Sequence, residues 1–189
     1  LERPLFFTHD WKEHVFKGSP AANAPALSIK APPDWKRSTM RTSKGFDMTK
    51  LASQPSFGLV RSCVAGVVET GVAEEIAQMR ERKPDIFESK EIVDKLEYLE
   101  LASGEHLRCG RTQVDGKRAC WTESRHDLSS PGKSSDFKVL MIFLPWAEKN
   151  AICVLGFCVE SENGRSAMER GWKEAAPIFR EMLNSAAVR

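Results

Sequence analysis

The sequence predicts an α+β domain built on an antiparallel sheet. Apolar stretches with the pattern of strands follow one another between residues 95 and 159, short glycine-containing turns separate several of them, and one long amphipathic pattern comes last. Strands joined by short turns pair antiparallel. A group of strands followed by a helix is typical of the α+β class.

The composition is that of an ordinary globular domain. The chain has 189 residues, of which 41% are hydrophobic and 29% charged, and this size suits one domain. It carries 28 Lys and Arg against 26 Asp and Glu. So balanced a charge argues against a nucleic-acid-binding surface and against a polybasic membrane anchor. No apolar stretch approaches the roughly 20 residues of a membrane span, so we expect none.

The first 25 residues are predicted to be an arm and linker ahead of a single domain at residues 26–189. Aromatic side chains are frequent in residues 1–17, whereas residues 18–25 combine Gly, Ser, Pro and Ala without periodicity, which is typical of a linker. The aromatic segment either packs on the domain or projects from it. Because the chain begins with Leu1, we expect a start that was removed by processing or trimming.

Two strands and a helix are predicted next. Residues 26–30 alternate apolar and polar side chains, as a short strand does. Residues 36–50 are polar and basic, and are predicted to be a loop with one extended piece. Residues 57–68 are apolar and β-branched and predict a second strand. Apolar residues at helical spacing then predict a helix over 72–81.

A meander of five strands follows, predicted over residues 96–101, 105–114, 117–125, 137–144 and 151–159. Asp115-Gly116 between two of them is a strong hairpin signal, and a type I′ turn requires a positive φ at Gly116. Residues 128–135 are predicted to be a loop. The last two strands are nearly unbroken apolar runs, so we expect them to be covered on both faces, or on one face and a helix edge.

The clearest element is an amphipathic helix over residues 167–187. Apolar side chains recur there at helical spacing with charged residues between them. Phe179 and Leu183 are expected to be buried against the last two strands. Pro177 is expected to kink the helix or to begin its second half.

Three motifs in this order carry a resemblance to a known family. Residues 28–35 combine a strand, two prolines and a tryptophan; residues 114–119 form a central hairpin; residues 151–159 and 177–185 form a last strand and a closing helix. In these features the chain resembles the PsbP-like family, which includes the extrinsic P subunit of the photosystem, the Mog-type Ran-binding factors and bacterial DcrB-like proteins.

The resemblance implies an α/β/α sandwich around a central antiparallel sheet. It also implies a non-catalytic module that binds a protein partner, here expected to be bacterial and exported, either periplasmic or lipid-tethered. No cofactor, metal ion or nucleic acid is expected. Two alternatives stay open: a cytoplasmic chaperone or adaptor for a secreted partner, and a small enzyme that uses a thiol or a histidine.

A basic stretch is the candidate surface for that partner. Trp35 stands beside it, and Trp146, in the turn after the fourth strand of the meander, is a second aromatic candidate. An aromatic side chain among cations is suited to an acidic protein surface. The alternatives are a solvated loop for the basic stretch and a cap on the sheet end for Trp146. The cations of the stretch are Lys36, Arg37, Arg41, Lys44 and Lys50.

The cysteines give only weak signals of chemistry. There are five, with no C-x-x-C pair, which argues against a zinc site. Cys109 and Cys120 share one face of the predicted hairpin in diagonal positions, so a disulfide and two thiols are both open. Cys153 and Cys158 are predicted to be small buried hydrophobes.

The histidines do not form a convincing catalytic group either. On a strand, Glu123 and His126 point to opposite faces. His126 with Asp127 is therefore expected to cap a turn or helix rather than to act as a dyad.

Overall fold

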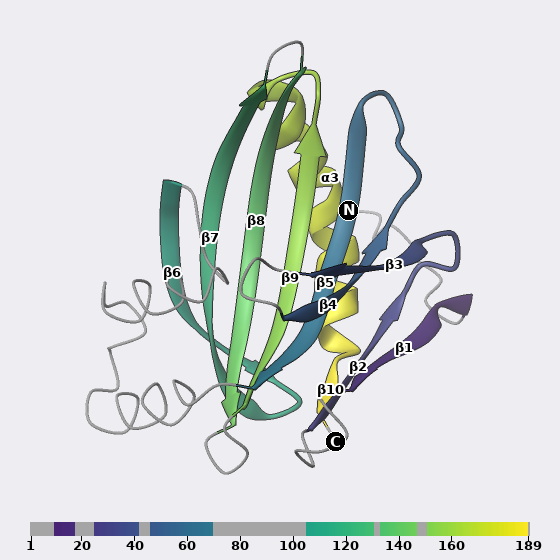
Figure 1. The fold of residues 1–189 in the computed structure, drawn as a ribbon, viewed down its shortest axis with the longest axis vertical. Helices are drawn as coiled ribbons and strands as arrows, with labels where there is room; N and C mark the ends of the chain where they lie inside the picture. The colour runs from purple at the N-terminus through teal and green to yellow at the C-terminus, as the bar shows by residue number, and fades with distance from the viewer. Residues whose placement is uncertain are drawn as a thin grey trace, which may run out of the picture.

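The computed structural model describes residues 10–17, 25–41, 46–69, 105–130, 133–146 and 151–188, which form two antiparallel sheets and one long helix (Figure 1). The strands are β1 (Lys12–Lys17), β2 (Ala26–Ala31), β3 (Lys36–Arg41), β4 (Asp47–Ala52), β5 (Leu59–Glu69), β6 (Glu105–Val114), β7 (Lys117–Ser130), β8 (Lys133–Trp146), β9 (Ala151–Ser161) and β10 (Ala187–Val188), and the helix is α3 (Arg165–Asn184).

The predicted α+β class with an antiparallel sheet is confirmed. The larger sheet has seven strands in the order β3-β4-β5-β9-β8-β7-β6, and every pair is antiparallel. Four strands of the predicted meander, β6 to β9, are consecutive neighbours. The helix expected over 72–81 and the strand expected over 96–101 lie outside the described residues, so the α/β/α sandwich stays a prediction.

The hairpin between β6 and β7 has the predicted turn. Asp115 has a φ of 50° and Gly116 a φ of 70°, as a type I′ turn requires. The register pairs Cys109 with Thr122 and Arg111 with Cys120, and all five cysteines are present as thiols rather than disulfides.

Two segments predicted as loops, the first with one extended piece, contain more strand than expected. Residues 36–50 contain β3 and most of β4, which form a hairpin with Met40 opposite Met48. Residues 128–130 continue β7 and residues 133–135 begin β8, with Leu128 opposite Ser135. Both segments are polar, and a strand at a sheet edge or beyond the core needs only backbone pairing, so it shows no apolar alternation. This is why pattern alone misses them.

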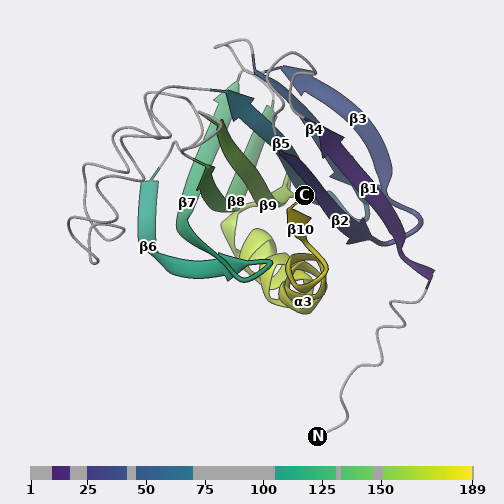
Figure 2. The same cartoon turned by 90° about the horizontal axis from the view of Figure 1, so that it is seen from below.

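Helix α3 covers one face of the larger sheet, with the smaller sheet β1-β2-β10 beside it (Figure 2). Phe179 is buried on the helix face that meets the sheet, as predicted, whereas Leu183 is only partly buried beside it. Gly171 lets the helix come close, because a Cβ there would lie 2.8 Å from Leu59 Cδ2. The helix runs through Pro177 as one element.

The residues that follow α3 form hydrogen bonds with β2 and with the turn between β6 and β7. Ser185 Oγ accepts a hydrogen bond from the Lys30 amide of β2 at 2.8 Å and donates one to the Met182 carbonyl at 2.6 Å. The Val188 amide donates to Asp115 Oδ2 in the type I′ turn at 3.0 Å. On the other side of β2, β1 pairs along its whole length, so the described part of residues 1–17 packs on the domain.

Candidate functional site

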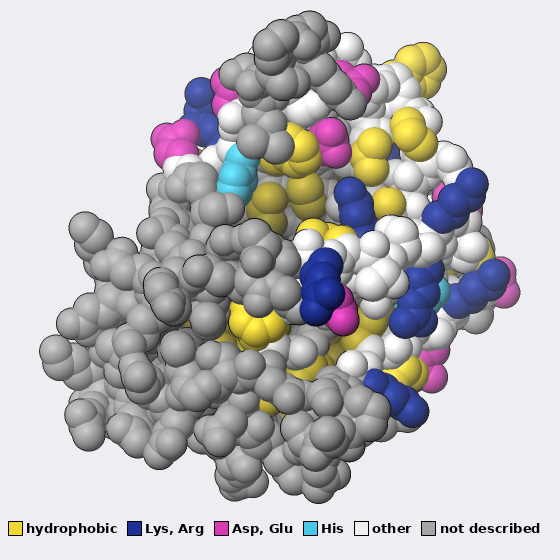
Figure 3. Space-filling view, in the orientation of Figure 1, with side chains coloured by type: hydrophobic (Ala, Val, Ile, Leu, Met, Phe, Trp, Pro, Cys, Tyr) yellow, Lys and Arg dark blue, Asp and Glu magenta, His cyan; other side chains and the backbone are white. Residues whose placement is uncertain are grey.

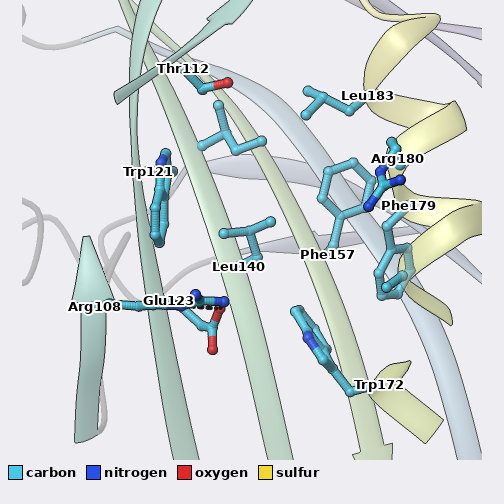
Figure 4. A pocket seen from close by; sticks show the side chains of 12 residues that line it. Arg108, Thr112, Trp121, Glu123, Leu140, Phe157, Trp172, Phe179, Arg180 and Leu183 are labelled. Atoms are coloured by element: carbon cyan, nitrogen blue, oxygen red, sulfur yellow. Dashed lines mark hydrogen bonds and ion pairs between the residues drawn. The ribbon is translucent and has the colours of Figure 1, made fainter. Parts of the chain in front are cut away.

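A cavity of about 330 Å³ lies between α3 and the β6–β9 half of the sheet (Figure 4). Its walls are mostly apolar, and its charged residues are Arg108, Glu123 and Arg180. Aromatic side chains come from both the sheet and the helix. The apolar residues are Trp121, Leu140, Ile142, Phe157, Trp172, Ala176, Phe179 and Leu183.

The strand side of the cavity depends on a glycine opposite a tryptophan. Gly110 on β6 pairs with Trp121 on β7, and a Cβ on Gly110 would lie 2.9 Å from the Trp121 ring. The indole can therefore lie across β6, where its Nε1 donates to the Arg111 carbonyl at 3.2 Å. Arg108 places its guanidinium carbon 5.7 Å from the indole centroid. The ring thus forms a fixed side wall.

On the helix side, the cavity is lined by a second row of α3 side chains, which lies beside the row that is buried in the core. Trp172, Ala176, Arg180 and Leu183 recur at spacings of four, four and three residues, so they lie on one side of the helix. Three of these side chains are apolar and one is an arginine. The Trp172 ring packs on Phe179, with centroids 5.6 Å apart, which joins this stripe to the core.

An ion-pair network adjoins the cavity, and two of its members, Arg108 and Glu123, line it. Glu123, whose side chain is only 6% exposed, accepts two hydrogen bonds from Arg108, at 2.7 and 3.0 Å, and lies 3.3 Å from Lys138 Nζ. Lys138 also bonds Glu169 of α3 at 3.0 Å and lies 5.4 Å from the Trp172 ring centroid. Buried charges are tolerated when paired in this way. The network therefore holds the strands and α3 together.

The prediction that Glu123 and His126 point to opposite faces of the sheet is confirmed. His126 Nε2 lies 3.3 Å from Ser124 Oγ, on the sheet face opposite to that of Glu123. His126 lies inside β7 rather than at the predicted end of the strand, which corrects its expected position. The reason is that β7 continues past the predicted end of the strand.

The structure separates the predicted partner-binding residues. Trp35 is only 7% exposed, and its ring packs edge-on against Phe179 at 6.5 Å; this corrects its assignment to the surface, because the indole is part of the core. Lys36, Arg37 and Arg41 are exposed along β3. Lys44 lies outside the described residues, and Trp146 is described only as the end of β8 opposite Ala151.

We call the exposed cations of two elements the basic surface: Lys12 and Lys17 of β1 with Lys36, Arg37 and Arg41 of β3. Because side chains alternate along a strand, Arg37 and Arg41 share one face of β3 and Lys36 lies on the other. Figure 3 shows Lys and Arg side chains on this side of the molecule, on the right of the view. Arg37 also lies over the Phe16 ring, 5.7 Å from its centroid. Arg41 forms an exposed ion pair with Asp47 at 3.5 Å.

His14 of β1 is partly buried beside the basic surface. Burial lowers the pKa of its imidazole, and the charges of Arg37 and Lys12 lower that pKa further. Its Nε2 is buried and has no hydrogen-bond partner among the described residues. The imidazole therefore stays neutral down to a lower pH than that of an unperturbed histidine.

This predicts a pH dependence of stability. The unfolded chain protonates His14 near its usual pKa of 6.5, whereas the folded chain does so only at lower pH. The contribution of neutral His14 to the free energy of unfolding is therefore complete above pH 6.5. It is lost as the pH falls from there through the pKa of His14 in the folded protein. We expect the melting temperature of the parent to fall more steeply below about pH 6.5 than that of His14→Gln, by differential scanning fluorimetry. Parallel curves for the two proteins would contradict it.

Three thiols are poor nucleophiles. Burial raises the pKa of Cys63, and it raises the pKa of Cys153 and of Cys158 to about 12. A thiol reacts as its thiolate, so these three are almost fully protonated at neutral pH. Cys153 is buried in the core, as predicted, and Cys158 is half-buried. Among the described residues, no three His, Cys, Asp or Glu side chains group as a metal ion would require.

The described residues define an α+β protein in which one helix closes a cavity against an antiparallel sheet. No family model and no curated protein sequence matches the chain. Among solved structures it is similar to LpqN, which is involved in cell envelope biogenesis of Mycobacterium tuberculosis, with a TM-score of 0.41 and 13% identity over 95% of this chain and 91% of that one. No helix in the described ranges is long and apolar enough to cross a membrane.

Proposed function

We propose that the chain is a non-catalytic binding module that recognises an acidic segment of a protein partner through its basic surface. The observation that carries the proposal is strand β3. It is an edge strand of the seven-stranded sheet, all six of its residues are exposed, and three of them are Lys or Arg.

The position of β3 favours an extended partner segment. An edge strand has a row of backbone groups that can pair with a further strand. The chain as a whole carries a net charge of only +2, so the cations of β1 and β3 are a local concentration. Such a patch attracts acidic partners and sets the rate of association more than the final affinity.

Other features support a non-catalytic role. The three thiols with a raised pKa are not poised for nucleophilic attack. Both oxygens of the buried Glu123 carboxylate are engaged within the protein, Oε2 by Arg108 and Oε1 by Lys138. Membership of the PsbP-like family and an exported location, periplasmic or lipid-tethered, stay predictions.

The experiment compares two triple charge reversals. The test variant changes Lys36, Arg37 and Arg41 to Glu, and the control changes three exposed cations of α3, Arg165, Arg170 and Lys173, to Glu. Immobilised parent and variants are exposed to an extract, and captured proteins are identified by mass spectrometry. We expect acidic proteins that the parent and the control capture to be lost from the test variant. The melting temperature should change little, because exposed charges contribute little to folding.

Salt provides the second part of the test. Capture by the parent should weaken as the Debye length falls from about 8 Å at physiological ionic strength to about 3 Å at 1 M. The rival explanation is that the cations of β3 only protect an edge strand from aggregation. If the test variant captures the same proteins as the parent with the same salt dependence, the rival is correct and the proposal fails.

A further inference from the structure

We propose that the cavity between α3 and strands β6–β9 binds a small anionic amphiphile, a molecule with an apolar body and a single carboxylate. This inference is independent of the proposed function. The basic surface lies at the β3 edge of the sheet, whereas the cavity lies toward the opposite edge, formed by β6.

The walls fit an apolar body. The volume of about 330 Å³ is at the lower end of the range of small-molecule sites, about 300–1,000 Å³. Trp121, Leu140, Trp172 and Leu183 pack against the core on one side and are only partly buried, so they leave apolar surface facing the cavity. Exposed apolar surface gathered at one concave site is typical of a binding site rather than of ordinary surface.

The charges of the cavity fit an anion. Arg108 reaches it from β6 and Arg180 from α3, on opposite sides (Figure 4). Glu123 compensates Arg108 through two hydrogen bonds. Arg180 is exposed and forms no ion pair with any described residue. The lining therefore has one positive charge in excess, which complements a single carboxylate and disfavours a cation.

The shape of the site places the carboxylate at the helix. Arg180 follows Trp172 and Ala176 on one stripe of α3, and Leu183 comes next. The guanidinium thus stands within an apolar stripe, next to the wall that an acyl chain or aromatic body would contact. A carboxylate that bonds Arg180 leaves the rest of the molecule against Leu140, Phe157 and Trp121.

Decanoate is the probe for this site, and decanol and inorganic phosphate separate its two parts. Binding is measured by isothermal titration calorimetry and by the fluorescence of the tryptophans, two of which line the cavity. We expect saturable binding of decanoate, weaker binding of decanol and no binding of phosphate alone. Phosphate that binds as well as decanoate would overturn the proposal, since the apolar body would then be irrelevant.

Two variants and a matched control locate the probe. Arg180→Gln should weaken decanoate about tenfold, the loss expected for one charge-assisted contact, and leave decanol unchanged. Lys173→Gln removes another exposed cation of α3 that does not line the cavity, and should leave both unchanged. Ala176→Leu adds volume inside the cavity and should abolish binding of both.

Three further results would overturn the inference. One is no saturable binding of decanoate to the folded parent. Another is equal binding by the parent and Arg180→Gln, because the charge complementarity would then be absent. The third is unchanged binding by an Ala176→Leu variant that retains the parent's circular dichroism, because decanoate would then bind elsewhere. Arg180→Gln is an exposed substitution, so it tests the site even if Ala176→Leu unfolds the chain.

Discussion

Phe179→Ala is expected to lower the free energy of unfolding by about 3–5 kcal/mol, the usual cost of removing a buried phenylalanine ring. The residue is only 4% exposed. Its ring centroid lies 5.0 Å from that of Phe157 on β9, 5.6 Å from Trp172 and 6.5 Å from Trp35. The substitution therefore opens a hole where the helix meets the sheet.

Chemical denaturation followed by circular dichroism measures this change. Arg180→Ala, at the next position of α3, is the control, since it removes an exposed side chain and should change stability by no more than about 0.5 kcal/mol. A loss below about 1 kcal/mol for Phe179→Ala would show that this ring does not hold the helix on the sheet.

Glu123→Ala is expected to destabilise the protein by about 3 kcal/mol, the lower end of the cost of breaking a buried ion pair. The carboxylate is 6% exposed, and its partner Lys138, whose side chain is 11% exposed, loses one of two anions. Glu169 still pairs with that lysine, which is why the lower end applies. The comparison is Asp47→Ala, which breaks the exposed pair with Arg41 and should cost less than about 1 kcal/mol.

A double variant separates the electrostatic interaction between Glu123 and Lys138 from the packing of their side chains. Replacing both charges at once, by Glu123→Leu with Lys138→Met, leaves no uncompensated charge within the pair. We expect the double variant to be more stable than the sum of the two single changes allows. Strict additivity in denaturation experiments would mean that the two charges do not act on each other.

The parts of the fold that follow local patterns were predictable. The strands β6 to β9, the type I′ turn and α3 each have a strong local signal, and neighbours in sequence are neighbours in space. Strands β3 and β4 were not predicted, since an edge strand such as β3, with the sequence KRSTMR, has no apolar face. The insertion of β9 between β5 and β8 also has no local signal, because it joins segments far apart in the chain.

The two candidate sites were predictable to different degrees. The cations of β3 are visible in the sequence, but Trp35 beside them is not distinguishable from a surface residue until Phe179 is seen packed against it. The cavity is lined by residues of four strands and one helix, and no single segment shows it. One signal was present and was missed: Arg180 interrupts an otherwise apolar stripe formed by Trp172, Ala176 and Leu183.

The pairing of β2 with β10 has a consequence for how the chain folds during synthesis. The amide of Lys30 bonds Ser185, which is 155 positions later, so a ribosome must release most of the domain before β2 can complete its sheet. Until then the apolar side of β2 has neither α3 nor β10 to cover it. Closing so long a loop is entropically costly and slow. The nascent chain therefore exposes an apolar strand for most of its translation, and chaperones that bind unfolded chains are expected to bind it.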